Sequence, residues 1–173
     1  ETLREFSAYK KYDKQPNEQL FAGFDVGKKR HPSHLVIFSR VGDTLKQLNQ
    51  TWLDGWPYSD QIEFLNEVAQ NFQLEKGYID NTRGELEDRG LEQVWHPMSF
   101  TSKSKHTMSQ VMEQYVHGDK LRLLKDERQT QQIISVNNDL KAPVTPMGHG
   151  DAFFSIAMAT LAAWETTIFK YQT

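Results

Sequence analysis

Residues 20–52 read LFAGFDVGKKRHPSHLVIFSRVGDTLKQLNQTW and contain three apolar runs, at residues 20–27, 34–41 and 44–52. Only Gly42-Asp43, a pair typical of tight turns, separates the second run from the third. The second run is rich in branched residues, which favour strands. The connections are short, so the stretch predicts three strands that open a sheet in antiparallel order.

Helix and strand patterns alternate over the rest of the chain. Helices are expected at residues 60–73 (with Ser59 as the cap), 85–90, 104–117 (ending at Gly118) and 126–136, and from Asp151 onward. Strands are expected at residues 76–80, 93–100 and 120–124. This order predicts an α/β fold, with a mixed central sheet whose later strands are parallel and whose faces are covered by helices.

The length of 173 residues suits about one domain. Residues 1–18 are polar and non-periodic, so we expect a linker or arm there and a single domain over residues 19–173. The chain contains no cysteine, which excludes disulfides, thiolate zinc sites and a cysteine nucleophile. Its net charge is −3, so net charge alone does not attract nucleic acid, and binding would require a local basic groove. No run approaches the ~18 apolar residues of a membrane span.

Three aspartates stand next to predicted strands or helices. Asp25 and Asp80 end the first and fourth strands, and Asp151 opens the last helix. If the two strands are parallel neighbours, their carboxyl ends meet where open α/β sheets bind ligands. Carboxylates gathered there repel one another, and hard divalent cations such as Mg²⁺ or Mn²⁺ relieve that repulsion. Two such ions support phosphodiester hydrolysis.

Each aspartate also has a structural interpretation. Asp25 lies before a turn, Asp80-Asn81-Thr82 is compatible with an Asx turn, and Asp151 is favourable near a helix N-terminus. The histidines His34, His96 and His117 have no spacing that indicates zinc.

Three motifs together resemble the nuclease domain of the large terminase subunit of tailed double-stranded DNA bacteriophages, which has a ribonuclease-H-like fold. They are F-D-V-G with the following H-P-S-H-L-V-I-F, Y-I-D-N-T-R-G, and G-H-G-D-A-F-F-S-I-A-M-A, and the resemblance covers about residues 20–165. It implies that Asp25, Asp80 and Asp151 are the catalytic and metal-binding residues. Some relatives carry a further acid where this chain has Ala152.

The resemblance implies two-metal cleavage of double-stranded DNA with Mg²⁺ or Mn²⁺ during viral genome packaging in the host cell cytoplasm. It also implies three partners, namely an N-terminal ATPase domain, the small terminase subunit and the portal. No phosphate-binding loop of an ATPase occurs in this sequence, so we expect the chain to be the nuclease part.

Basic side chains near these motifs are candidate DNA contacts, because phosphates are bound by lysine and arginine. The candidates are Lys28, Lys29, Arg30, Arg83, Lys103 and Lys105. His149 is a possible auxiliary residue beside Asp151.

Two other functions remain open from the sequence. One is a Holliday-junction resolvase or transposase-type nuclease of the same fold, which uses acids at similar positions. The other is a non-catalytic module that binds DNA or the portal. A resolvase would act on branched DNA, whereas a terminase nuclease would cut linear or plasmid duplex. A non-catalytic module would not bind metal at the three aspartates.

Overall fold

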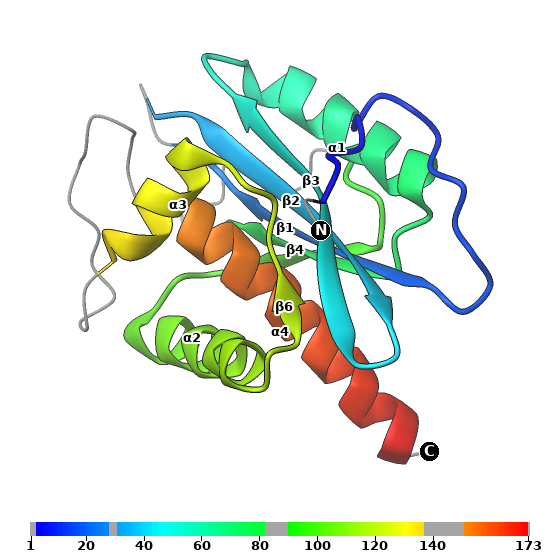
Figure 1. Cartoon of the computed structure of the whole chain (residues 1–173). Helices are drawn as coiled ribbons and strands as arrows, with labels where there is room; N and C mark the ends of the chain where they lie inside the picture. The colour runs from blue at the N-terminus through cyan, green and yellow to red at the C-terminus, as the bar shows by residue number, and fades with distance from the viewer. Residues whose placement is uncertain (1–2, 28–30, 82–89, 137–150, 173) are drawn as a thin grey trace.

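The computed structural model describes residues 3–27, 31–81, 90–136 and 151–172 (Figure 1). The elements in chain order are β1 (Gln19–Asp25), β2 (Ser33–Val41), β3 (Thr44–Leu53), α1 (Tyr58–Phe72), β4 (Lys76–Asp80), β5 (Trp95–Met98), α2 (Ser102–His117), β6 (Leu121–Arg122), α3 (Glu127–Ile134) and α4 (Asp151–Gln172). The strands form one six-stranded sheet in the order β5-β4-β1-β2-β3-β6.

The sheet is mixed, as the sequence predicts. β1, β2 and β3 pair in antiparallel fashion, with Gly42 in a positive-φ conformation at the turn of the second hairpin. β4 pairs in parallel with β1, β5 with β4, and β6 with β3. Because β1 and β4 run in the same direction, their last residues, Asp25 and Asp80, reach the same edge of the sheet.

Alternating residues of the central strands face two separate cores. Leu20, Ala22 and Phe24 of β1 belong to the core under α1. Phe21 of β1 and Val36 of β2 belong to the core formed with α2 and α4. Figure 1 shows α1 on one side of the sheet and α2 and α4 on the other. The period of two along each strand therefore decides which helix each side chain meets.

α4 lies directly on β1 at Gly23. A Cβ atom added to Gly23 would come within 1.9 Å of the backbone oxygen of Ser155 and 3.0 Å of the backbone nitrogen of Ala159. Only a residue without a side chain permits this approach. The small residues of α4 in the same region, Ala157 and Ala159, are fully buried.

Two predicted helix starts are wrong by a few residues. α1 begins at Tyr58 with Pro57 as its N-cap and no side-chain cap, so Ser59 lies inside the helix. The proline is suited to a helix start because its φ of −60° is already close to helical values. α2 begins at Ser102, two residues before the predicted start, because Thr101 is its N-cap and forms a capping box with Ser104. Gly118 ends α2 as predicted.

Residues 3–18 contain no helix or strand, but they lie against the domain on the α1 side. The ring of Phe6 contacts those of Tyr12 and Phe72, at centroid distances of 5.2 and 5.8 Å. The backbone N–H of Phe6 donates to Leu48, and Ala8 is buried. Their role as a linker stays a prediction.

The predicted helix at residues 85–90 lies, except for Gly90, outside the described residues. Among the helices that the structure describes, none combines the length and hydropathy needed to cross a membrane.

Gly23→Ala tests the contact between α4 and β1. The added methyl group meets backbone rather than a movable side chain, so we expect a loss of about 3 kcal/mol or more, the upper end for overpacking. This loss lowers Tm by roughly 6 °C or more in thermal denaturation. The control is Gly118→Ala, at a φ of −79°, whose nearest contact is 3.2 Å away, and it costs far less. Equal Tm values for the two variants would contradict the close approach.

Candidate metal centre at the end of β1

Three buried carboxyl groups meet at the edge where β1 and β4 end. Asp25 is the last residue of β1, Asp80 is the last residue of β4, and Asp151 is the first residue of α4. Their exposed fractions are 5%, 3% and 9%. The carboxyl group of Asp25 shares hydrogen bonds with those of Asp80 and Asp151. The structure thus brings together three residues that lie far apart in the sequence.

This arrangement disfavours negative charge on Asp25. Burial raises the pKa of Asp25 well above its usual value, and the nearby charges of Asp151 and Asp80 raise it further. A divalent cation would remove this repulsion, because each carboxylate then faces positive charge.

The donor set suits a hard cation. The three groups offer only carboxylate oxygens, which favour Mg²⁺ or Mn²⁺ over zinc. Within the described residues, no three His, Asp or Glu side chains are already placed around one position as the ligands of a metal ion.

α3 holds the N-terminus of α4, and with it Asp151. The buried side-chain oxygen of Gln132 accepts a hydrogen bond of 2.9 Å from the backbone N–H of Ala152. This bond satisfies one of the amides that every helix start leaves without a partner inside the helix. No pattern in the sequence points to Gln132, because a glutamine in a short polar helix carries no signal of such a contact.

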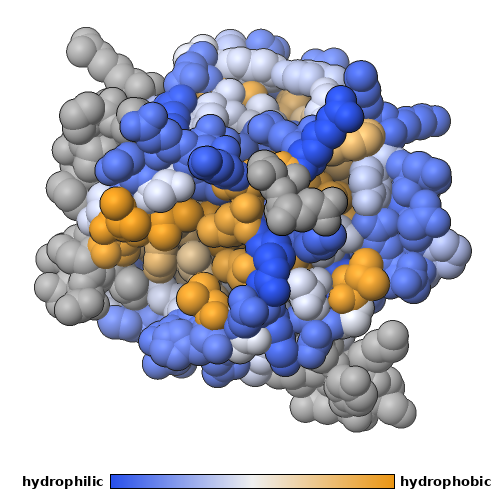
Figure 2. Space-filling view, in the orientation of Figure 1, coloured by the Kyte–Doolittle hydropathy of each residue, from blue (hydrophilic) through white to orange (hydrophobic). Residues whose placement is uncertain are grey.

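α3 itself is anchored by polar contacts. Its buried residues are Gln129 and Gln132, whereas Ile134 is 67% exposed. The amide groups of Gln129 and Gln47 of β3 bond to each other at 2.7 and 2.9 Å. In Figure 2, hydrophobic residues lie at the surface over α3 and the start of α4.

His34 lies on the same face of the sheet as Asp25, its cross-strand partner on β2. It is fully buried, and burial lowers its pKa to about 4, so the imidazole is neutral at pH 7. Its Nε2 lies 3.1 Å from the acceptor oxygen of Gln50, and its Nδ1 lies 2.5 Å from the hydroxyl of Ser155 on α4. A neutral ring that donates to Gln50 accepts from Ser155, so His34 ties β2 to α4 beside the aspartates.

Of the candidate DNA contacts, the structure describes the two lysines at the start of α2. The ammonium nitrogen of Lys105 lies 5.3 Å from the ring centroid of Phe154, one turn after Asp151 on α4. Lys103 is exposed at the same end of α2. Positive charge therefore stands close to the start of α4. Five further candidates lie outside the described residues, namely Lys28, Lys29, Arg30, Arg83 and His149.

Comparison with known proteins gives matches among solved structures only. No family model matches the sequence, and no match is found among curated proteins. The large terminase nuclease from thermophilic phage G20c with bound magnesium matches with a TM-score of 0.66 and 17% identity, covering 86% of this chain and 84% of that one. The Thermus phage P74-26 large terminase nuclease domain matches with a TM-score of 0.68 and 16% identity, over 91% and 88% of the two chains.

A third match is the large terminase nuclease domain from bacteriophage SPP1 with bound Mn. Its TM-score is 0.58 and its identity is 9%, over 87% of this chain and 88% of that one. At these identities the matches establish the fold. The chain has the ribonuclease-H-like fold of large terminase nuclease domains, which confirms the resemblance predicted from the three motifs.

Asp25→Asn tests the electrostatic cost of the carboxyl cluster. Folding raises the pKa of Asp25 above its unfolded-state pKa of 3.8. The protonated carboxyl group therefore stabilises the fold at low pH, and this contribution to the free energy of unfolding is lost as pH rises above 3.8. An amide keeps hydrogen bonds without the charge. In EDTA we expect Asp25→Asn to raise the free energy of unfolding by about 1 kcal/mol or more, roughly 2–4 °C in Tm. The gain is larger at pH 8 than at pH 5.

The matched control is Asp13→Asn, at an exposed position, and it leaves Tm unchanged. Mn²⁺ raises the Tm of the unsubstituted protein and has less effect on Asp25→Asn. An Asp25→Asn variant less stable than the unsubstituted protein in EDTA at pH 8 would mean that Asp25 is a structural residue.

Proposed function

We propose that the chain is a divalent-metal-dependent endonuclease that cuts double-stranded DNA during viral genome packaging. The observation that supports this most is the cluster of Asp25, Asp80 and Asp151, buried at one sheet edge of a fold shared with terminase nuclease domains. Two of the similar structures contain magnesium and Mn, respectively.

The metal site would hold two Mg²⁺ or Mn²⁺ ions, bound by Asp25, Asp80 and Asp151. When bound, such ions activate water and stabilise the charge of the phosphate during hydrolysis. The protein contributes the positions of the three carboxylates. β1 and β4 supply two of them on neighbouring parallel strands, and α4 supplies the third through its contact with β1. Gln132 and His34 act as positioning residues through α4.

DNA would approach the edge that carries the aspartates. Lys103 and Lys105 at the start of α2 would contact backbone phosphates. Lys28, Lys29, Arg30 and Arg83 are further candidates by sequence, and His149 is a candidate auxiliary residue. With a net charge of −3, binding depends on such local groups and is sensitive to salt.

Packaging requires a motor and a portal as well as a nuclease. We propose that this domain follows an N-terminal ATPase domain, with residues 1–18 as the linker, and works with the small terminase subunit and the portal in the cytoplasm of the infected host.

Plasmid cleavage tests the activity and its ligands. Supercoiled DNA is incubated with Mg²⁺, Mn²⁺, Ca²⁺ or EDTA, and nicked and linear products are measured. We expect cleavage with Mg²⁺ or Mn²⁺ and none with EDTA. Asp25→Asn, Asp80→Asn and Asp151→Asn each reduce the rate at least about 100-fold, because each removes a metal ligand.

Asp13→Asn serves again as the exposed control and cuts at the normal rate. Circular dichroism establishes that each variant is folded. Full activity in all three aspartate variants would refute the metal centre, and preferential cutting of four-way junctions over linear duplex would favour a resolvase.

The lysines of α2 are tested by DNA binding at several salt concentrations. Replacing both Lys103 and Lys105 with Gln removes up to two phosphate contacts. We expect the slope of log K against log salt to fall by about 1–2. The control replaces the exposed pair Lys10 and Lys11, in the N-terminal segment on the α1 side, and leaves the slope unchanged. Equal slopes for the two double variants would count against contacts at α2.

A further inference from the structure

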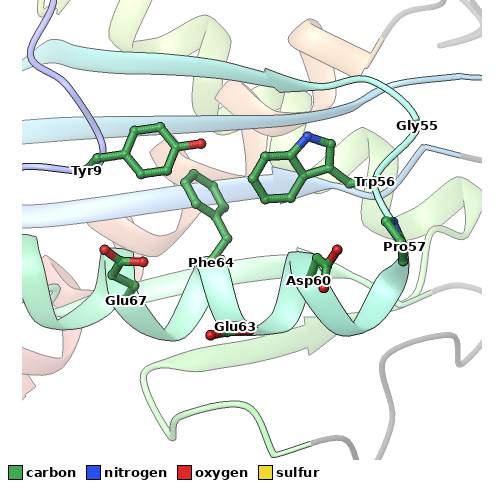
Figure 3. Close-up of a pocket in the computed structure, with 8 residues that line it drawn as sticks. All are labelled: Tyr9, Gly55, Trp56, Pro57, Asp60, Glu63, Phe64 and Glu67. Atoms are coloured by element: carbon green, nitrogen blue, oxygen red, sulfur yellow. The ribbon is translucent and has the colours of Figure 1, made fainter.

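A hollow of about 350 Å³ lies on the α1 side of the sheet, away from the start of α4. Three parts of the chain form it: the N-terminal segment, the connection from β3 to α1, and α1 itself. Figure 3 shows the rings of Tyr9, Phe64 and Trp56 in a row alongside α1, with Phe64 in the middle.

The three rings form a fixed aromatic wall. The ring centroid of Phe64 lies 5.5 Å from that of Tyr9 and 5.7 Å from that of Trp56. Phe64 is buried, whereas Tyr9 is 56% exposed. More than half of the Tyr9 surface is therefore open to a ligand. Next to Tyr9, the side chain of Asn71 on α1 donates to the backbone oxygen of Ala8 and so ties the N-terminal segment to α1.

The other wall of the hollow carries negative charge. Asp60, Glu63 and Glu67 project from α1 at spacings of three and four residues, which place them along one face of the helix. All three are exposed, and none belongs to an ion pair formed within the described residues. In Figure 3, Glu67 lies near Tyr9 and Asp60 lies near Trp56. Aromatic faces and carboxylates both attract cations.

A second hollow, of about 220 Å³, continues the first. Both are lined by Gly55, Trp56 and Pro57, and the second also includes the apolar side chain of Leu53 and the ring of Tyr58. We call the two adjoining hollows the trough. Its first part is acidic and aromatic, and its second part is lined by polar as well as apolar side chains, among them His31 and Gln61. Alternate side chains of an extended peptide are about 7 Å apart and would enter adjacent hollows.

We propose that this trough binds an extended segment of a partner protein that inserts an arginine side chain between the aromatic row and the carboxylates of α1. A planar guanidinium stacks on aromatic rings and bonds to carboxylates with two N–H groups, which a lysine ammonium does not. The residue two positions along the segment lies in the second hollow, against Tyr58. The same carboxylates repel DNA, so this face serves a protein.

The probe is a heptapeptide, acetyl-Gly-Ser-Arg-Gly-Leu-Ser-Gly-amide, titrated into ¹⁵N-labelled protein at low salt and followed by NMR. We expect saturable shifts of the Trp56 indole N–H and of the α1 amides, half-complete at about 0.1–1 mM, as suits one anchored side chain. The same peptide with citrulline has the shape of arginine without its charge, and we expect it to bind about 10-fold more weakly.

Substitutions on the protein identify the site. Glu63→Gln, Glu67→Gln and Tyr9→Leu should each weaken binding about two- to fivefold, the range of one exposed cation–π or charge contact. The matched control is Glu75→Gln, an exposed glutamate outside the trough, which leaves affinity unchanged. No step of this test uses nuclease activity, so it stands apart from the proposed cleavage of DNA.

Three results would overturn the proposal. They are the absence of localised shifts with the arginine peptide, equal affinity for the citrulline peptide, and an effect of Glu75→Gln as large as that of Glu63→Gln. Equal affinity for citrulline would mean that the trough is an apolar docking groove. Shifts of Trp56 and α1 that appear with protein concentration alone would identify a second copy of the chain as the occupant.

Discussion

The contact between α4 and β1 at Gly23 determines how the rest of the structure is arranged. With no side chain on Gly23, the backbone of α4 lies directly on the strand, and the helix crosses the sheet close to its centre. The first residue of α4, Asp151, then meets the end of β1, where Asp25 stands. Any larger residue would hold the helix away from the strand. The carboxyl cluster thus depends on the absence of a side chain two residues before its central member.

The cluster opposes stability, and the surrounding residues compensate for it. Three buried acids repel one another once they lose their protons. Two large apolar cores, one on each face of the sheet, hold the strands that carry Asp25 and Asp80. Buried amide contacts through Gln132 secure the helix that carries Asp151. An unfavourable charge cluster held by a rigid frame is common at catalytic sites, where function rather than stability decides the residues.

The two faces of the molecule have different chemistry. On the α4 side, the acids are buried and Lys105 of α2 stands close to the start of α4, which suits a polyanion. On the α1 side, the acids are exposed beside aromatic rings, which suits a cation. The sites that we propose for DNA and for a basic partner therefore lie on different faces. Tyr9 of the N-terminal segment belongs to the face on the α1 side.

The sequence by itself determined the order of strands and helices, the antiparallel start of the sheet and the three aspartates at strand or helix ends. These features are local, since apolar spacing, turn residues and motif letters report them directly. The aspartates meet because two contacts of the tertiary structure bring their elements together. β1 pairs with β4, and α4 packs on β1 at Gly23. Gln132, His34 and the aromatic trough came only from the tertiary structure. Their partners lie many residues away, and no pattern within a short stretch records which side chains will face one another across two packed layers.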